Sequence, residues 1–545
     1  MTHRHLSYFL ACLSLSHCAY KDQRVDLIVH NGTIHTLDGS NDRVEAMAIR
    51  DGRIIELGAE RQIMNRYRAD RTVDLAGRIV FPGFIDGHCH FLGYGLNKQK
   101  VDLTGTRTWD EVVQRTRAFA DAHPEKEWIM GRGWDQNDWP MPTEPDNDRL
   151  NALFPDRPVL LQRVDGHAAV VNQAAMDRAG LDPDRSIEGG MLVERDGRPT
   201  GLLIDNAVSV FQQVFDQADE ATKRRALLDA QQDCVDLGLT MVVDAGLDTG
   251  TIALMERMQQ SGELKIRIYA MVRDDRASLA HFERTGLIIT DRLVVRAIKV
   301  YADGALGSRG ALLKQPYTDR PDLIGLQLAP TDHFADIADW CMANGFQMAT
   351  HCIGDSANSL VLRTYAEKLG GTNDRRWRIE HAQVIDPEDI DLFGKYGIIP
   401  SVQPTHATSD APWAEARLGP DRIRTAYAYA GLSGQLGLLA LGTDFPVEAI
   451  DPLGTFRSAV FRVDAEGRPH GGYRMEEALS DMQALRGMTI WNAIATFTEN
   501  DLGSLEAGKW ADFVVLDQDL IGTTLERLSR THVTATFIAG EQVDR

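Results

Sequence analysis

Two histidines one residue apart, His88 and His90, close an apolar run that begins at Val80. Side chains two positions apart in a β-strand share one face, so both imidazoles can reach a single cation while Cys89 points to the other face. Imidazole nitrogen binds zinc, iron, nickel and related divalent ions. Surface pairs and core histidines also produce this pattern, so it indicates only half of a metal site.

More residues of metal-binding type lie in or at the end of four later apolar segments: Lys299, His351, His381 and Asp444. Each alone has a plain structural explanation, such as a core histidine, a helix-capping aspartate or a lysine paired with a carboxylate. The ends of parallel strands meet at one face, however, and the four residues would join the first pair there. Together they predict a metal centre.

The segments that must position these residues alternate between short apolar strands and helical patterns. Such alternation predicts βαβ units and a parallel sheet, and eight strands predict an α/β fold of the (β/α)8 barrel type over residues 81–502. Residues from about 125 to 225 break the alternation and predict an inserted, lid-like subdomain over the barrel mouth. The eight predicted strands lie within residues 84–88, 240–244, 266–271, 295–300, 347–351, 377–381, 398–402 and 438–444.

Both ends of the chain have a sequence pattern that differs from the alternation of strands and helices between them. Residues 24–80 and 503–545 contain β-rich runs separated by glycine-containing turns, and we expect them to pair into one small β-sandwich, because either piece alone leaves open sheet edges. Residues 1–20 resemble an export signal, which predicts the bacterial periplasm. A lipoprotein box ending at Cys18 would anchor the protein facing the periplasm, but His17 stands where a small residue is required.

The amino-acid composition limits the kinds of partner that this protein could bind. The formal net charge is −21, and no basic run is present, which argues against nucleic acid and favours a small molecule. No segment after the leader has the roughly 18 apolar residues of a membrane span. The cysteines beyond the leader, at positions 89, 234, 341 and 352, form no disulfide framework. A homodimer is left open.

The order His-x-His, Lys, His, His, Asp on strands one, four, five, six and eight resembles the amidohydrolase superfamily of metal-dependent hydrolases. Three segments narrow the resemblance to its amidohydrolase 3 branch, which contains N-substituted formamide deformylase and its YtcJ-like relatives. These segments are Gly131-x-Gly-Trp-Asp135, residues 302–310 (ADGALGSRG) and residues 442–446 (GTDFP). The resemblance covers nearly the whole chain after the leader.

The resemblance implies one or two divalent ions, zinc by default, with His88, His90 and Asp444 on the more buried metal and His351 and His381 on a second one. Lys299 would bridge the two only if carboxylated, because an ammonium group has no lone pair to offer a metal. An unmodified Lys299 favours a mononuclear site.

The implied reaction is hydrolysis of a non-peptide amide. Metal lowers the pKa of a bound water, Asp444 would accept the water proton and deliver it to the leaving nitrogen, and His351 or His167 could donate to the carbonyl oxygen. An ester, carbamate or lactone hydrolase would use the same site, and a non-catalytic metal-containing binding protein is a third reading.

Substrate contacts are predicted for residues that follow strands or lie in the insertion. His167 belongs to an Asp-Gly-His stretch, and Arg309 could bind a substrate carboxylate or pair with Asp303 or Asp444. Strict alternation turns Glu380 away from the metal. The predicted substrate-binding residues are Trp134, Asp135, His167, Arg309 and Gln403.

Overall fold

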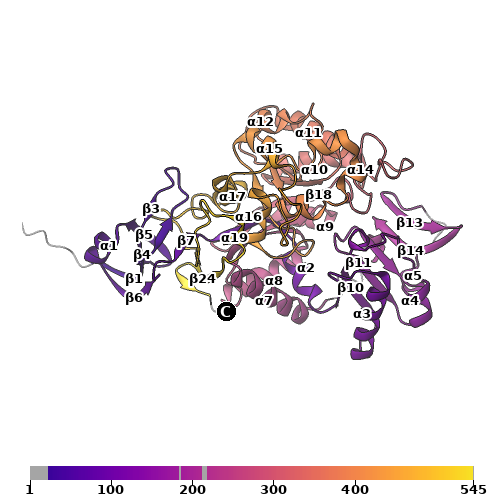
Figure 1. Ribbon diagram of the computed structural model, residues 1–545, viewed down its shortest axis with the longest axis horizontal. Coiled ribbons are helices and arrows are strands. Elements are labelled where there is room, and N and C mark those ends of the chain that lie inside the picture. The colour runs from indigo at the N-terminus through magenta and orange to yellow at the C-terminus, as the bar shows by residue number, and fades with distance from the viewer. Residues whose placement is uncertain (1–22, 183–185, 212–217, 544–545) are drawn as a thin grey trace, which may run out of the picture.

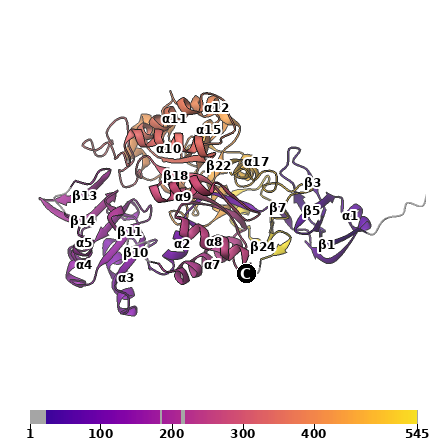
Figure 2. The ribbon, with the colours of Figure 1, turned by 180° about the vertical axis from the view of Figure 1, so that it is seen from behind.

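The computed structural model describes residues 23–182, 186–211 and 218–543. The predicted export signal, residues 1–20, and the lipidation question at Cys18 lie outside the described residues. Figure 1 shows three parts in a row: a β-rich part at the N-terminal end, a central barrel wrapped by helices, and an inserted sheet at the far end. Figure 2 shows the same order from behind.

Eight parallel strands form the barrel, and all eight predicted strands are present. They pair in chain order, from the first strand around to the last. The strands are β8 (Phe84–Cys89), β15 (Leu239–Leu247), β16 (Arg267–Arg273), β18 (Leu293–Tyr301), β19 (Gln347–Cys352), β20 (Arg378–His381), β21 (Ile399–Val402) and β22 (Ala440–Leu441). A ninth strand, β17 (Ile288–Ile289), pairs antiparallel with β18 in the same sheet. Parallel strands covered on both faces read as continuous apolar runs, which is why these segments were visible in the sequence.

The barrel closes where β8 meets the chain after β22. The backbone N–H of Asp444 donates to the carbonyl of His88 at 2.8 Å, and that of His90 donates to the carbonyl of Phe445 at 2.8 Å. The buried Asn492 amide donates to the carbonyls of Ile85 and Leu441, at 2.7 and 2.8 Å. We refer to this region as the seam, and it sets two predicted metal ligands side by side.

Gly87 is required at the seam because the two strands approach closely. A Cβ added there would lie 2.5 Å from the Asn492 side-chain oxygen and 2.7 Å from the Leu441 carbonyl oxygen. Real Cβ atoms do not come that close to backbone. The glycine before the first histidine is therefore a packing requirement of the barrel.

Helices cover the outside of the barrel (Figure 1). Asp219 caps the first helix after the insertion by accepting from the backbone N–H of Thr222. The helices of the barrel region are α2 (Phe91–Asn97), α7 (Glu220–Asp236), α8 (Thr249–Gln260), α9 (Arg276–Thr285), α10 (Thr331–Asn344), α11 (Asp355–Leu369), α12 (Asp391–Tyr396), α13 (Pro404–Ser409), α14 (Ala414–Arg422), α15 (Tyr429–Leu436), α16 (Pro452–Val460), α17 (Asp481–Gly487) and α18 (Ile490–Ala495).

The terminal segments form two packed sheets. One contains β1 (Gln23–His30), β4 (Ala46–Arg50), β5 (Arg53–Gly58) and β6 (Tyr67–Asp74), and the other contains β2 (Thr33–His35), β3 (Arg43–Val44), β7 (Ile79–Pro82), β23 (Phe513–Leu516), β24 (Val533–Ile538) and β25 (Glu541–Gln542). The antiparallel pairing of β7 with β23 joins the two ends of the chain. Leu27, Met47, Val80 and Phe513 meet in the core between the sheets.

A six-stranded mixed sheet lies between β8 and β15 in the chain. Its strands are β9 (Val101–Asp102), β10 (Ile129–Trp134), β11 (Val159–Arg163), β12 (Ala168–Val171), β13 (Gly190–Arg195) and β14 (Arg198–Asp205). The helices α3 (Trp109–Ala122), α4 (Asp148–Leu153) and α5 (Gln173–Ala179) accompany them. The sheet thus begins at Val101, ahead of the predicted start of the insertion near residue 125. The domain boundaries themselves stay a prediction.

Candidate metal centre

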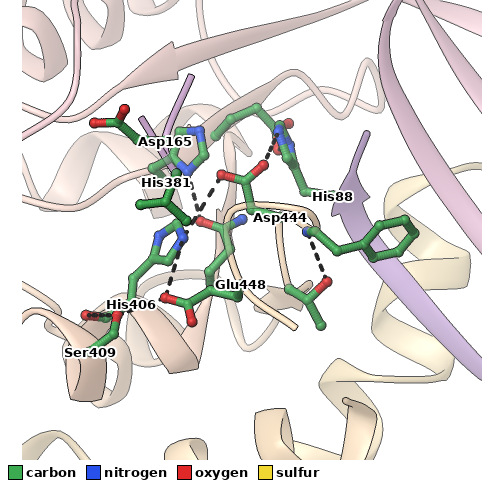
Figure 3. Close-up of polar contacts among 12 residues, drawn as sticks. His88, Asp165, His381, His406, Ser409, Asp444 and Glu448 are labelled. Atoms are coloured by element: carbon green, nitrogen blue, oxygen red, sulfur yellow. Dashed lines mark hydrogen bonds and ion pairs between the residues drawn. The ribbon is translucent and has the colours of Figure 1, made fainter. Parts of the chain in front are cut away.

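The predicted ligands come together at the carboxyl end of the barrel strands. One nitrogen each of His88 and His381 and one carboxylate oxygen of Asp444 lie within 4.8 Å of one another, and all three residues are buried. His90 Nε2 lies 3.3 Å from Asp444 Oδ1, and Lys299 Nζ lies 3.3 Å from His88 Nε2. Figure 3 shows His88 and His381 on either side of Asp444.

Three of the histidines are anchored through Nδ1. His88 Nδ1 donates to the Glu380 carboxylate at 2.5 Å, and His90 Nδ1 donates to the Ala245 carbonyl at 3.2 Å. His381 Nδ1 donates to the Gln403 side-chain oxygen at 2.7 Å. These acceptors fix the proton on Nδ1 and leave the Nε2 lone pair free, which is the arrangement that metal-binding histidines adopt.

Two further atoms at this end of the barrel are buried and make no hydrogen bond. They are Asp444 Oδ1, within the ligand group, and His351 Nε2, which lies 3.7 Å from Asp303 Oδ1. An unpaired buried polar group is costly, by about 1–3 kcal/mol, unless something else satisfies it. The His351 ring lies 4.5 Å from that of His381, centroid to centroid. Imidazole nitrogens with one carboxylate oxygen are the donor set of a divalent metal, so the residues fit the predicted ion.

Backbone strain marks the same place. His381 has a φ of 72° and Asp444 a φ of 62°, both in the left-handed region that residues other than glycine rarely adopt. Such conformations cluster at functional sites, where the surrounding structure holds them. At the seam, Asp86 supplies part of that hold: its carboxylate accepts from the Thr443 hydroxyl at 2.7 Å and from the His88 backbone N–H at 3.1 Å.

The centre is electrostatically unusual. Burial, followed by the Lys299 charge, lowers the pKa of His88 to about 4, so this imidazole is neutral at pH 7. Burial also lowers the pKa of Lys299 to about 8, against the opposing pull of Glu380 and Asp444. For Asp444, burial acts to raise the pKa, but the adjacent His90 ring and the other nearby histidines hold it well below the usual range. Neutral imidazoles and an ionised carboxylate are the states that bind metal.

The prediction that Glu380 faces away from the metal centre is wrong. Its carboxylate points into the barrel, where it accepts from His88 and from Arg378 Nε at 2.6 Å. The neighbouring Ile379 packs into the outer core, so Arg378 and Glu380 share the inner face of β20. His381 would face outward by strict alternation, and its positive φ turns it back towards the centre.

A cavity of about 1840 Å³ opens from the metal centre towards the inserted sheet. Asp135 and His167 line it, as do His90, Lys299, His351, His381 and Asp444. His167 Nδ1 donates to Asp205 at 2.7 Å. Burial acts to lower the pKa of His167, but this hydrogen bond and the charge of Asp205 raise it. Asp135 accepts from Arg163 at 2.6 Å.

The other three predicted substrate-binding residues, Trp134, Arg309 and Gln403, do not line the cavity, contrary to the prediction. Trp134 is buried in the core of the inserted sheet, where its indole N–H donates to the Leu161 carbonyl at 2.8 Å. Arg309 pairs with Asp319 at 2.9 Å rather than with Asp303 or Asp444. Gln403 holds His381, so its place is behind a ligand. The structure therefore does not support substrate contact for Trp134, Arg309 or Gln403.

Two further side chains, His406 and Glu448, lie close to Asp444. His406 Nε2 lies 3.8 Å from Asp444 Oδ2 and 4.0 Å from a Glu448 oxygen (Figure 3). His406 follows the seventh barrel strand, and this position after a strand end was its only signal in the sequence. Glu448 follows Asp444 by four residues in a loop, and no periodic pattern marks it.

With its barrel, its terminal sandwich and this ligand set, the chain has the architecture of a metal-dependent hydrolase. Residues 71–544 match the model of the amidohydrolase family, and the chain belongs to that family. YtcJ of Bacillus subtilis (strain 168), whose name assigns it to the amidohydrolases, is 33% identical over 529 residues, covering 95% of this chain and 99% of that protein.

Two further relatives support this assignment. N-substituted formamide deformylase of Arthrobacter pascens is 26% identical and covers 95% of this chain and 98% of its own. Among solved structures, an uncharacterised metal-dependent hydrolase of Pyrococcus horikoshii OT3 superposes with a TM-score of 0.74 at 26% identity, covering 91% of this chain and 98% of its own. The resemblance predicted from the sequence is confirmed.

None of the helices in the described part of the chain is both long and apolar enough to cross a bilayer. Cys89, Cys234, Cys341 and Cys352 are buried free thiols, as expected for a fold without a disulfide framework.

Proposed function

We propose that this protein is a metal-dependent hydrolase that cleaves the carbon–nitrogen bond of a non-peptide amide. The observation that carries the proposal is the convergence of His88, His381 and Asp444 around one point at the base of the cavity. The formamide deformylase relative acts, by its name, on such a bond, which supports the choice among hydrolytic reactions.

The chain's own residues have distinct roles in this proposal. His88, His90, His381 and Asp444 would hold the first ion, and His351, whose ring lines the cavity 4.5 Å from that of His381, would contribute to a second. A divalent ion bound here would lower the pKa of a bound water to about 7 and would polarise the substrate carbonyl. Zinc is the ion that we expect, although iron, manganese and nickel accept the same donors.

Asp444 moves the proton. Its ionised carboxylate faces the cavity with one oxygen unpaired, so it can accept a proton from the attacking water. The same carboxyl then delivers that proton to the departing nitrogen, because an amine leaves only when protonated. His167, whose ring lies 5.1 Å from that of His351, is placed to donate to the substrate carbonyl oxygen.

We further propose that Lys299 is carboxylated. Its Nζ lies 3.3 Å from His88 Nε2, and an ammonium there would offer the ion only N–H donors. The neutral amine would attack carbon dioxide, forming an N–C bond and releasing one proton, and the resulting carbamate would supply oxygen ligands. A carbamate signal after growth in 13C-bicarbonate, present in the native protein and absent in Lys299→Ala, would support this step.

The test of the function is a comparison of matched amides and esters on purified, metal-assayed protein. We expect turnover of amides from a diverse library, with kcat/KM for the best amide at least equal to that of the matched ester. Higher kcat/KM for esters, carbamates or lactones throughout would redirect the assignment to those bonds. Ligand retention without product would instead indicate a binding protein. Export to the periplasm is proposed on residues 1–20 alone, and fractionation of cells tests it.

A further inference from the structure

One cation on the cavity wall is not matched by a carboxylate. Arg132 lies on β10 and lines the cavity together with the metal-centre residues. Its Nε and Nη2 both donate to the Val164 carbonyl, at 3.2 and 2.9 Å. Among the residues that the structure describes, Arg132 makes no ion pair. A guanidinium has five N–H donors, so most of the outward edge, including Nη1, is left for another acceptor.

Asp165 and Asp444, the two carboxylates whose charges act on the pKa of Arg132, both lie against other groups. Asp165 accepts from Arg163 Nη1 and, at 3.0 Å, from the backbone N–H of His167. Asp444 faces the histidines of the metal centre. Arg163 shows the contrast, because Asp135 and Asp165 both pair with it and neutralise its charge. The two arginines of this wall therefore differ: Arg163 is structural, whereas Arg132 keeps an unmatched charge beside the cavity.

The backbone is shaped to receive the guanidinium. Gly166 has a φ of 78°, and an added Cβ would lie 3.1 Å from Arg132 Nη2 and 3.5 Å from its Cζ. The guanidinium thus rests on a turn where a side chain would displace it. Arg132 is the variable position of Gly131-x-Gly-Trp-Asp135, and Gly166 is the middle of the Asp-Gly-His stretch. The two sequence segments meet at this contact.

A second basic residue lines the same wall. Lys100 lines the cavity together with Arg132, and its ammonium donates to Asn97 Oδ1 at 3.1 Å. Burial, followed by the charge of Arg132, lowers the pKa of Lys100 to about 8. Burial likewise lowers the pKa of Arg132, with Asp165 and Asp444 opposing that change, and a guanidinium remains charged at any physiological pH.

We propose that Arg132 binds a carboxylate of the substrate, so that the preferred substrates are amides that also carry an acidic group, such as N-acyl amino acids. This inference rests on the proposed function and specifies its substrate class. The free edge of the guanidinium suits the two oxygens of a carboxylate, and the partly desolvated cavity wall strengthens the contact. Arg132 is thus a specificity-determining residue that touches the substrate away from the scissile bond.

The experiment compares acids with their neutral counterparts. N-formyl, N-acetyl and N-benzoyl derivatives of glycine, alanine and phenylalanine are assayed as free acids and as primary amides of the same carboxyl group. For pairs that are turned over the readout is kcat/KM, and for pairs that are not it is Kd by calorimetry. The proteins are the native enzyme, Arg132→Gln, Arg132→Lys and, as a charge-matched surface control, Arg178→Gln, which alters an exposed pair with Glu127.

We expect the native enzyme and Arg178→Gln to prefer the acid of at least one pair by about 10- to 100-fold, the range of a hydrogen bond to a charged group. Arg132→Gln should lose that preference while binding the neutral member as before, which also shows that it is folded, and Arg132→Lys should keep part of it. Equal handling of acid and amide by the native enzyme, failure of every acid to bind, or an unchanged preference in Arg132→Gln would overturn the inference.

The two levels of proposal fail separately. If no member of any pair is hydrolysed but acids bind through Arg132, the anion site stands and the reaction must be reassigned. If neutral amides are hydrolysed as well as acids, the reaction stands and the site on Arg132 is refuted.

Discussion

Glu380 and His88 are joined by a hydrogen bond of 2.5 Å in the interior of the barrel, although 291 positions of chain lie between them. The same carboxylate accepts from Arg378 Nε and Nη2, at 2.6 and 2.9 Å. Glu380 does not itself face the cavity, yet it fixes which nitrogen of His88 is free. We therefore expect metal affinity to depend on a carboxylate that does not itself contact the ion.

Replacement of Glu380 should weaken metal binding before it affects anything else at the site. Glu380→Gln keeps the shape but leaves the buried charge of Arg378 without its partner. We expect metal affinity to fall by about 10- to 100-fold and the free energy of unfolding to fall by about 3–5 kcal/mol. Chelator competition and urea unfolding measure the two effects. The exposed Glu388→Gln is the control, and unchanged metal affinity in Glu380→Gln would contradict the role.

Asp444 should be the most sensitive residue for turnover. Asp444→Asn removes the group that accepts and returns the proton, and we expect kcat for an amide to fall by about 10²- to 10⁴-fold. Metal content is determined on the same samples, because Asp444 is also a proposed ligand. Asp121→Asn, at an exposed pair with Arg117, should retain native turnover. Native turnover in a metal-loaded Asp444→Asn protein would exclude Asp444 as the proton carrier.

We expect the Asn492 side-chain amide to stabilise the seam. Asn492→Ala removes the side-chain donor to the buried carbonyls of Ile85 and Leu441. We expect a loss of about 2–4 kcal/mol in the free energy of unfolding, measured by denaturant titration. Asn344→Ala, which loses only one contact to Trp340 within its own helix, should lose less. Equal losses in the two variants would argue against the seam as a special contact.

We expect the pair formed by His333 and Asp274 on the cavity wall to contribute to the free energy of unfolding in a pH-dependent way. His333 Nε2 lies 2.7 Å from Asp274, and this hydrogen bond raises the pKa of His333 above its ordinary value. A raised pKa stabilises the folded state below the unfolded value near 6.5, and the contribution is lost as the pH rises through the folded pKa. His333→Gln should therefore cost a few tenths to about 1 kcal/mol at pH 5.5 and nothing at pH 9.

The readout for His333 is the difference in unfolding free energy between variant and native protein at the two pH values. The exposed His470→Gln serves as the control, with no difference between the two conditions. A loss in His333→Gln that is equal at pH 5.5 and pH 9 would show that packing, not charge, is responsible.

The barrel was predictable because its strands are buried on both faces and appear as uninterrupted apolar runs. The gathering of His88, Lys299 and Asp444 followed from topology, since the carboxyl ends of parallel strands meet. The hydrogen bonds at the seam could not be predicted. The Asn492 side chain bonds to carbonyls that lie 407 and 51 positions away in the chain, and no local sequence pattern identifies such distant partners.

Side-chain direction at strand ends was the main source of error. Glu380 was assigned to the wrong face because His381 leaves the β region, and a single positive φ cancels the period of two. Trp134 and Arg309 were assigned to the substrate through their motifs alone. In the structure, Trp134 packs in the core of the inserted sheet, and Arg309 forms an ion pair with Asp319 in the loop after β18. Neither side chain is therefore available to a substrate.

The pairing of β7 with β23 has a consequence for biosynthesis. The edge of β7 that accepts β23 emerges from the ribosome early, whereas its partner is translated only after the entire barrel. Until then that edge is open to pairing with other chains. A ribosome-bound intermediate with a complete barrel and an unfinished sandwich should thus be the species most in need of a chaperone, and loss of the last strands should expose the protein to aggregation while leaving its catalytic residues intact.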